Sequence, residues 1–333
     1  MRHIAFISER LEMPKVKCDI LKWARKTAGL SLEQAAKKLS IRDGKKSTAA
    51  EKLSSYEDGS KEPSRSLLRR MASQYNRPLL TFYLEHPPVS GDRGEDFRHH
   101  PSRYEAFENV RVDVLIRDIK ARQSVIRESL LDTDEDGPLD FVGKHRMSDG
   151  MAALVKTIVS ATEFDLGDYA KRSSYREAFN YLRKKVEDAG VFVILKGNLG
   201  SHHSSISSTV FRGFALSDPI APFIVINDQD SEKAWSFTLL HEFAHLLLGR
   251  TGVSGSDCEM KIEKFCNSVA SELLLPEVIF DSFKPDTSSR EELCAAVDDF
   301  AYSAKLSSSH VLYRLFLRGD ISKRLWLELS EEY

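Results

Sequence analysis

The sequence predicts an α+β protein that is mostly helical and carries a small three-stranded antiparallel sheet. Apolar residues recur at helical spacing from Cys18 to about Leu84, and again from about Tyr104. Three short runs rich in β-branched and aromatic residues follow between Val191 and Asp228, and the pattern after them is helical to the end. This order favours helices, then a small sheet, then helices.

Residues 1–85 are expected to form one domain of five helices. Gly29 ends the first helix, as a C-terminal glycine does, and Ser31 begins the second. Gln34 follows Ser31 by three residues, which is the pattern of a capping box. The other three helices are expected at about Thr48–Glu57, from Ser64 onward, and after Pro78.

The rest of the chain divides into three further stretches. Residues 86–103 are rich in proline, glycine and charge and are expected to be a linker. Residues 104–280 are expected to hold a helical region and a domain whose core is 185–280, and residues 281–333 a C-terminal helical region. The predicted helices of the middle stretch are about Tyr104–Leu131, Met151–Ser160 and Ser173–Ala189, and the predicted strands are Val191–Gly197, Thr209–Ser217 and Ala221–Asp228.

Composition excludes several classes of protein. A formal net charge of −2 gives no overall attraction to nucleic acid, so a DNA-binding surface has to be a local patch. The four cysteines form no CxxC pair and are too scattered for a disulfide framework, which favours a reduced, cytoplasmic setting. The sequence contains neither a signal-like segment nor an apolar run long enough to span a membrane.

The motif that carries chemistry is HEFAH, residues 241–245. Residues four apart lie on one face of a helix, so His241 and His245 can reach a single metal ion. Glu242 lies beside them, where it can accept a proton from a metal-bound water. The motif stands in an apolar helical frame, where two histidines and a glutamate without a metal would be costly to bury. We therefore predict a catalytic zinc site with Glu242 as the general base.

A third ligand has to come from another segment, because catalytic zinc usually takes three protein ligands and keeps one position for water. The next predicted helix, KIEKFCNSVASELLLP, carries Glu263 near its start. Asp257 and Glu259 compete for the role, and Glu263 is favoured. Asn267 follows Glu263 by four residues and is expected to orient a ligand from outside the coordination sphere.

At this point the motifs resemble a known family. HEFAHLLLG followed by IEKFCNSVASELLLP, with FRGFALSDPIAPFIVIN before it, resembles the ImmA/IrrE metallopeptidases. The N-terminal segments LKWARKTAGLSLEQAAKKL and KLSSYEDGSKEPS resemble the helix-turn-helix domain of XRE-type regulators. The two resemblances cover about residues 18–84 and 185–325, and the peptidase motifs are the more specific.

The resemblance implies a gluzincin-like zinc endopeptidase that cleaves a repressor-like transcription factor in a stress, mobile-element or phage-defence response. By position, His241, His245 and Glu263 match the metal ligands of the family and Glu242 its general base. Many members have Glu-Ala-Asn where this chain has Phe265-Cys266-Asn267. Cys266 is expected to be a packed thiol. No residue is assigned to the oxyanion: His203 is a candidate, although a solvent-exposed loop histidine is the more ordinary interpretation.

The predicted third helix of the N-terminal domain is the one that would enter the DNA major groove. The segment before it is longer than in compact relatives, and nearby acidic residues dilute its charge, so a helical module that binds protein is the competing interpretation. The helix-turn-helix class often dimerises, which makes a homodimer a possible assembly. The candidate DNA contacts are Lys45, Lys46, Ser47, Thr48, Lys52 and Ser55.

Two functions of other classes remain open. One is a transcription regulator whose metal site is structural or sensory and does not cut peptides. The other is a toxin-like or defence component that acts by binding a partner. Residues 298–322 also have a helix–turn–helix cadence, for which packing against the metal domain is the favoured role, and Tyr302 and His310 within them are unassigned.

Overall fold

The computed structural model divides into two compact units, Met1–Gly91 and Asp92–Tyr333. We describe each unit by itself. In the part described, no helix combines the length and the apolar character needed to cross a bilayer. The structure describes residues 16–44, 47–84, 86–87, 105–133, 137–200, 204–250, 257–287 and 289–332.

The described residues of the first unit form four α-helices and a final 3₁₀ turn. Ser31 caps α2 through a reciprocal pair with Gln34, and Thr48 caps α3 through the same arrangement with Glu51. The predicted fifth helix is the 3₁₀ turn η1, which follows Pro78. The elements are α1 (Cys18–Thr27), α2 (Leu32–Lys38), α3 (Ala49–Glu57), α4 (Arg65–Gln74) and η1 (Leu79–Tyr83).

One buried ion pair joins two helices of this unit. Nε of Arg25 on α1 lies 2.6 Å from Oε1 of Glu57 at the end of α3, and both side chains are under 10% exposed. The guanidinium also donates to the carbonyl of Leu30, which follows α1. A buried ion pair tolerates the loss of one partner poorly, because the remaining charge stays out of water.

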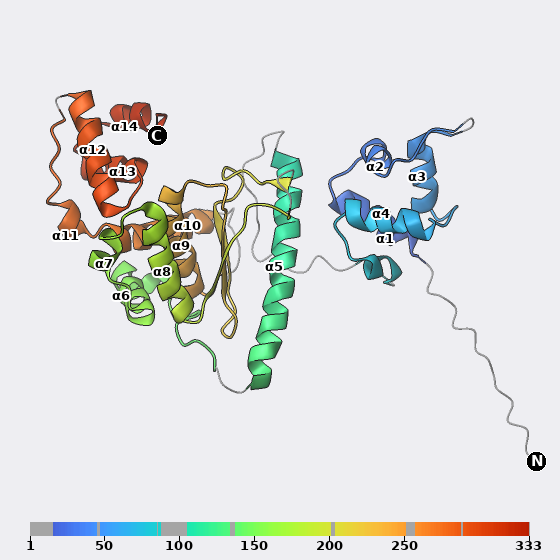
Figure 1. Ribbon diagram of the computed structural model, residues 1–333, viewed down its shortest axis with the longest axis horizontal. Coiled ribbons are helices and arrows are strands. Elements are labelled where there is room, and N and C mark those ends of the chain that lie inside the picture. The colour runs from blue at the N-terminus through green and yellow to red at the C-terminus, as the bar shows by residue number, and fades with distance from the viewer. Residues whose placement is uncertain are drawn as a thin grey trace, which may run out of the picture. The chain divides into compact units, whose positions relative to one another are not determined.

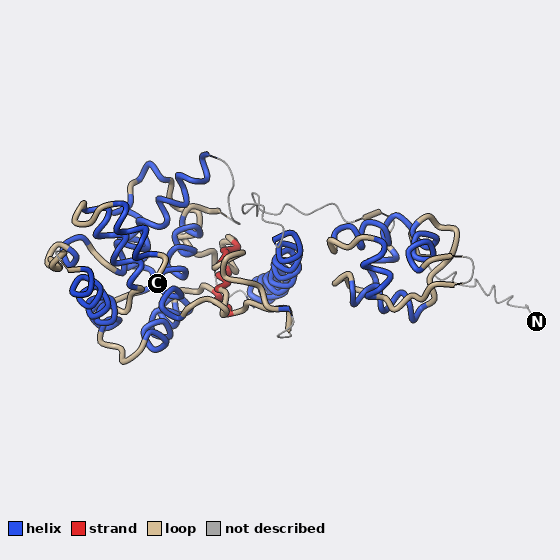
Figure 2. Tube along the Cα trace, turned by 90° about the horizontal axis from the view of Figure 1, so that it is seen from above, coloured by secondary structure: helices blue, strands red, loops and turns tan. Residues whose placement is uncertain are grey.

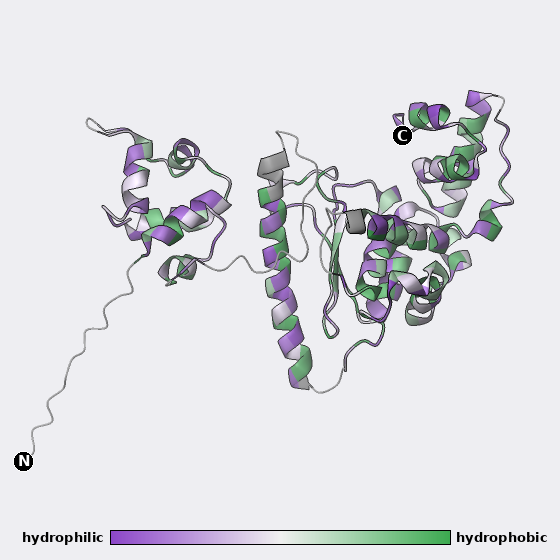
Figure 3. Ribbon diagram, turned by 180° about the vertical axis from the view of Figure 1, so that it is seen from behind, coloured by the Kyte–Doolittle hydropathy of each residue, from purple (hydrophilic) through white to green (hydrophobic). Residues whose placement is uncertain are grey.

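The second unit is a three-layer arrangement around a small sheet (Figures 1 and 2). One layer is the long helix α5 (Glu105–Thr133), along which hydrophobic residues are interrupted by hydrophilic ones (Figure 3). The sheet is the middle layer, and α8 and α9 cover its other face. The helices of this unit after α5 are η2 (Met147–Asp149), α6 (Met151–Thr162), α7 (Leu166–Ala170), α8 (Tyr175–Asp188), α9 (Glu232–Leu247), α10 (Asp257–Leu274), α11 (Glu277–Phe280), α12 (Arg290–Ala304), α13 (Ser308–Arg318) and α14 (Lys323–Ser330).

The sheet is mixed, which corrects the antiparallel arrangement expected from the sequence. Its strands β1 (Phe192–Leu195), β2 (Gly213–Leu216) and β3 (Phe223–Ile226) stand in the order β1-β3-β2. The pair β2–β3 is antiparallel as expected, but β1 runs parallel to β3. All four residues of β3 are buried, whereas β1 is partly exposed. The central strand is thus fully buried. A short continuous apolar run such as that of β1 occurs in buried strands of either direction, so it does not fix the direction of pairing.

Alternate residues of the sheet pack against different layers. Phe214 and Val225 belong to the cluster that includes Leu115 and Ile119 of α5. Ala215 and its neighbours on β3 face the opposite way, into the core formed with α8, α9 and α10. This core extends into α12 and α13, so the last helices of the chain share it.

We expect Glu57→Ala to lower the stability of the first unit by about 3 kcal/mol, because it leaves Arg25 buried without its partner. Hydrogen exchange of α1 and α3 amides in the full chain measures this loss. Glu62→Ala, at an exposed position in the same unit, is the control and should change stability by less than about 0.5 kcal/mol. Equal effects of the two substitutions would contradict the prediction.

At Gly213, β2 lies close to α9. A Cβ atom there would lie 2.6 Å from Cγ2 of Thr238, 3.0 Å from the Val225 carbonyl oxygen and 3.2 Å from Cγ of Glu242. We expect Gly213→Ala to cost roughly 1–3 kcal/mol, since the sheet and the helix have to separate.

Thermal unfolding measures this cost, and Thr238→Ser in the same chain should recover part of it by removing the nearest methyl group. Gly137→Ala is the control, because nothing lies within 4 Å of its added Cβ. The close-approach argument fails if Gly213→Ala and Gly137→Ala unfold at the same temperature.

Candidate metal and catalytic site

Helix α9 positions three candidate residues of the site. Ser231 caps its N-terminus by accepting a hydrogen bond from the amide of Lys233. The helix is buried over most of its length, including Glu242 and His245. A helix held on several sides fixes its side-chain directions, and the spacing of four puts His241 and His245 on one face.

Helix α10 packs against α9 and brings Glu263 to the same place. Ile262, Cys266 and Val269 are buried in the shared core, which turns the neighbouring Glu263 toward the histidines. Cys266 is a free, buried cysteine, and burial raises the pKa of its thiol. It is therefore a neutral packed thiol.

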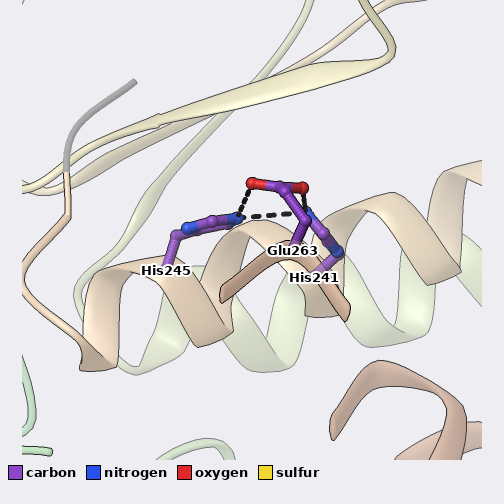
Figure 4. A group of neighbouring side chains, drawn as sticks. All are labelled: His241, His245 and Glu263. Atoms are coloured by element: carbon purple, nitrogen blue, oxygen red, sulfur yellow. Dashed lines mark hydrogen bonds and ion pairs between the residues drawn. The ribbon is translucent and has the colours of Figure 1, made fainter. Parts of the chain in front are cut away.

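Three side chains converge on one point (Figure 4). Nε2 of His241 lies 3.1 Å from Nε2 of His245. The two carboxylate oxygens of Glu263 each lie 3.2 Å from one of these nitrogens, Oε2 from His241 and Oε1 from His245. The structure thus brings together the three residues that the sequence predicted as metal ligands.

The charges of the cluster are strongly coupled. Burial opposes a charge on His241, but its hydrogen bond with Glu263 and the negative charges of Glu242 and Glu263 together outweigh this, so the pKa of His241 is raised. Burial likewise opposes ionisation of Glu263, yet both imidazoles hold the pKa of its carboxyl well below the ordinary value. The carboxylate is therefore ionised and available to a cation.

The donor set fits a zinc ion. Two imidazoles and a carboxylate are ligands that zinc favours, at about 2.0–2.1 Å, which separates ligand atoms of a tetrahedron by roughly 3.3 Å. The observed separations of 3.1 and 3.2 Å are close to that value. The Nδ1 atoms of His241 and His245 are buried without a partner among the described residues. The Nε2 atoms are thus the ones that face the cluster.

Glu242 lies beside the cluster and not in it. Its side chain is 7% exposed, and burial raises the pKa of its carboxyl. A carboxyl group with a raised pKa exchanges protons nearer to neutral pH than an ordinary glutamate, which suits general acid–base chemistry.

The cluster opens into a cleft of about 530 Å³. One wall is residues 208–213, the segment that leads into β2, and the floor is α9 and α10. The opposite wall is the start of α13. The polar side chains of the cleft beyond the cluster are Ser208, Thr209, Arg212, Lys233, Thr238, Asn267, Ser307, Ser309 and His310.

The other predicted residues of this site have different positions. Asn267 lines the cleft one helical turn after Glu263, and a hydrogen bond of its side chain with His241 contributes to the raised pKa of that imidazole. The side chains of Asp257 and Glu259, the competing ligands, lie outside the described residues. So does His203, the candidate for the oxyanion.

The candidate DNA contacts of the first unit are only partly described. Lys45 and Lys46 lie outside the described residues. Thr48 caps α3, and the ammonium group of Lys52 donates to the carbonyl of Arg42 at 2.7 Å. Ser55 donates to the carbonyl of Lys52. The main-chain carbonyl of Ser47 accepts from the amide of Gly44 at 2.8 Å. All four described candidates therefore take part in hydrogen bonds within the unit.

Sequence reasoning missed the wall that α13 contributes. Ser307, Ser309 and His310 line the cleft although more than 60 residues separate them from the HExxH motif. Ser307, three residues before His310, is a typical N-cap, so the start of this helix is predictable from the local sequence. No local pattern predicts that this helix start faces the cluster of His241, His245 and Glu263.

Comparison with known proteins bears on the same part of the chain. Residues 187–316 match the family model Peptidase_M78, described as the IrrE N-terminal-like domain. No curated protein matches the chain. The matched stretch begins in α8, ends in α13 and contains the whole cluster together with His310. The match supports the ImmA/IrrE family and a metallopeptidase-type function for this part of the chain.

Proposed function

We propose that the chain is a zinc-dependent endopeptidase whose ligands are His241, His245 and Glu263 and whose general base is Glu242. The observation that carries this proposal is the convergence of two imidazoles and a carboxylate, whose ligand atoms lie within 4.8 Å of one another, beside a buried glutamate and at the floor of a cleft. A bound zinc ion would polarise the scissile carbonyl group and lower the pKa of a water molecule.

The chain's own groups would move the protons. Glu242 would accept one from the attacking water and later deliver it to the leaving amine. Its burial supports both steps, because a raised pKa makes the carboxylate a stronger base than an ordinary glutamate. Gly213 supports the arrangement by letting β2 approach Glu242 without a side chain between them.

The cleft suits an extended peptide. β2 is an edge strand of the sheet, and the segment that leads into it lines the cleft. A substrate lying along this segment would pair with it through main-chain hydrogen bonds, as peptides do when they add to a sheet edge.

The substrate we propose is a repressor-type transcription factor, cut in a stress, mobile-element or phage-defence response. The resemblance of the N-terminal motifs to XRE-type regulators supports a regulatory setting. Exposed Arg65, Arg69 and Arg70 in the first unit would suit either DNA or an acidic protein surface. This unit would therefore bind DNA, or hold the substrate.

Substitution of Glu242, the proposed general base, distinguishes a peptidase from a protein whose metal site is only sensory or structural. We expect Glu242→Gln to keep zinc and lose cleavage by at least about 100-fold, because the amide cannot take a proton. His241→Ala should lose both. Zinc content and the appearance of fragments on co-expression with candidate repressors are the measurements.

A regulator with a structural metal would behave in the opposite way. Glu242→Gln would then act like the wild type while His241→Ala would not. A component that works by partner binding alone would keep its effect after chelation of the metal.

A second substitution tests the third ligand. We expect Glu263→Ala to weaken zinc binding by more than about 100-fold, since it removes one of three protein ligands. Competition with a chromogenic chelator measures the affinity. Asp257→Ala and Glu259→Ala are the matched controls, and a larger loss in either one would transfer the role of ligand to that residue.

A further inference from the structure

His310 stands in the wall of the cleft that the start of α13 forms, next to α9. It is the third residue of α13, and the hydroxyl of Ser307, which caps that helix, accepts from its main-chain amide. Its ring contacts the ring of Phe237 at 5.2 Å between centroids, and Phe237 in turn stacks on His241. Since Phe237 precedes His241 by four residues, His310 lies about one helical turn from the cluster.

Hydrogen bonds fix the orientation of this imidazole. Arg314 Nη1 lies 2.9 Å from Oγ of Ser271, and Nε2 of His310 lies 3.2 Å from the same oxygen. A guanidinium group only donates, so Ser271 accepts from Arg314. A serine oxygen can accept from two donors, but Nε2 of His310 is the one atom able to accept that the described residues place within hydrogen-bond distance of this hydroxyl. The hydroxyl proton is therefore assigned to the bond with Nε2.

The other ring nitrogen follows from this assignment. Burial, and next to it the positive charge of Arg314, lower the pKa of His310 to about 4, so the ring is neutral at neutral pH. A neutral imidazole whose Nε2 accepts carries its proton on Nδ1. None of the described residues hydrogen-bonds to Nδ1, and this atom is not among the buried polar atoms without a partner. It therefore keeps an open N–H in the cleft.

Several hydrogen bonds hold Arg314, the residue that shares Ser271 with His310. Arg314 is 8% exposed and also donates to the carbonyl of Leu275 at 2.9 Å and to the carboxylate of Glu277. It thereby joins α13 to the end of α10, the helix that carries Glu263. An N–H donor held in this way needs no rearrangement when a substrate arrives, which is the property that makes a donor effective in a site.

We propose that His310 is a substrate-contacting residue that donates a hydrogen bond from Nδ1 to a main-chain carbonyl oxygen of the peptide in the cleft. This inference rests on the proposed peptidase function and adds to it a residue from outside the HExxH motif. Ser271 and Arg314 are positioning residues, because they act only through the imidazole. The rival interpretation is that His310 serves the packing of α13 on α10.

Two substitutions separate the nitrogen atoms of the ring. The amide of asparagine occupies the place of Nδ1, and that of glutamine reaches the place of Nε2. We expect His310→Asn to keep a donor in the cleft and stay within about fivefold of the wild-type kcat/KM, while His310→Gln loses about 10- to 100-fold. A packing role predicts the reverse, since His310→Gln preserves the contact with Ser271.

The probe is a pool of tryptic peptides from a bacterial lysate, cut by the zinc-loaded full chain and read by mass spectrometry; the best-cut peptide then serves for kinetics. Zinc content and thermal unfolding are measured on each variant, and both should match the wild type within error. A wild-type chain that binds zinc and cuts nothing contradicts the proposed function itself. Cleavage by the wild type with equal kcat/KM in the two variants overturns only the role of His310.

A spectroscopic signature tests the same inference without any substrate. Long-range ¹H–¹⁵N correlation on the histidine-labelled full chain should show His310 protonated on Nδ1 alone at pH 7, with His310→Gln identifying its signals. Ser271→Ala should change this pattern, because Nε2 loses the hydroxyl that it accepts from. A ring protonated on Nε2, or on both nitrogens, at pH 7 would overturn the proposal.

Discussion

The packing of α10 on α9 is the constraint on which the rest of the second unit depends. It holds the carboxylate of Glu263 3.2 Å from two imidazoles that are themselves 3.1 Å apart. Imidazole and carboxylate groups are unfavourable to bury in a core unless hydrogen bonds, an ion pair or a metal ion compensate for their lost hydration. The buried residues between the helices, such as Cys266 and Val269, carry no chemistry but fix the separation of the two imidazoles from the carboxylate.

The sheet has a different task, which is to place one wall of the cleft. β3 is buried on both faces and acts as the centre, so β2 is left as an edge beside α9. Buried Asn227, just after β3, donates to the carbonyls of Ile206 and Phe211 and so holds the segment that lines the cleft. Gly213 then lets that segment reach Glu242. The strand pair β2–β3 therefore determines both where the wall formed by residues 208–213 lies and how closely it approaches Glu242.

How much of this was predictable from the sequence depends on whether the information is local. The caps at Ser31 and Thr48, the helix of the HExxH motif and the pairing of β2 with β3 follow from neighbours in the chain, and the structure has them. The direction of β1 does not, because an apolar run reads alike in parallel and antiparallel pairs, and that prediction was wrong. The position of His310 depends on how α13 docks, which no spacing within the chain encodes.

The docking of α13 also links the last helices to the cluster of His241, His245 and Glu263. Arg314 is buried and its donors are used by Ser271, Leu275 and Glu277, all at or beyond the end of α10. Removing α13 would leave these acceptors without their cation and expose the core residues that Val311 and Leu315 cover. Glu263 lies on α10 as well. A substitution that alters the contact of Arg314 with the end of α10 would therefore shift this helix and, with it, the carboxylate of Glu263. One packed core, to which α9, α10 and α13 all contribute, therefore positions both the α13 wall of the cleft and the side chains of His241, His245 and Glu263.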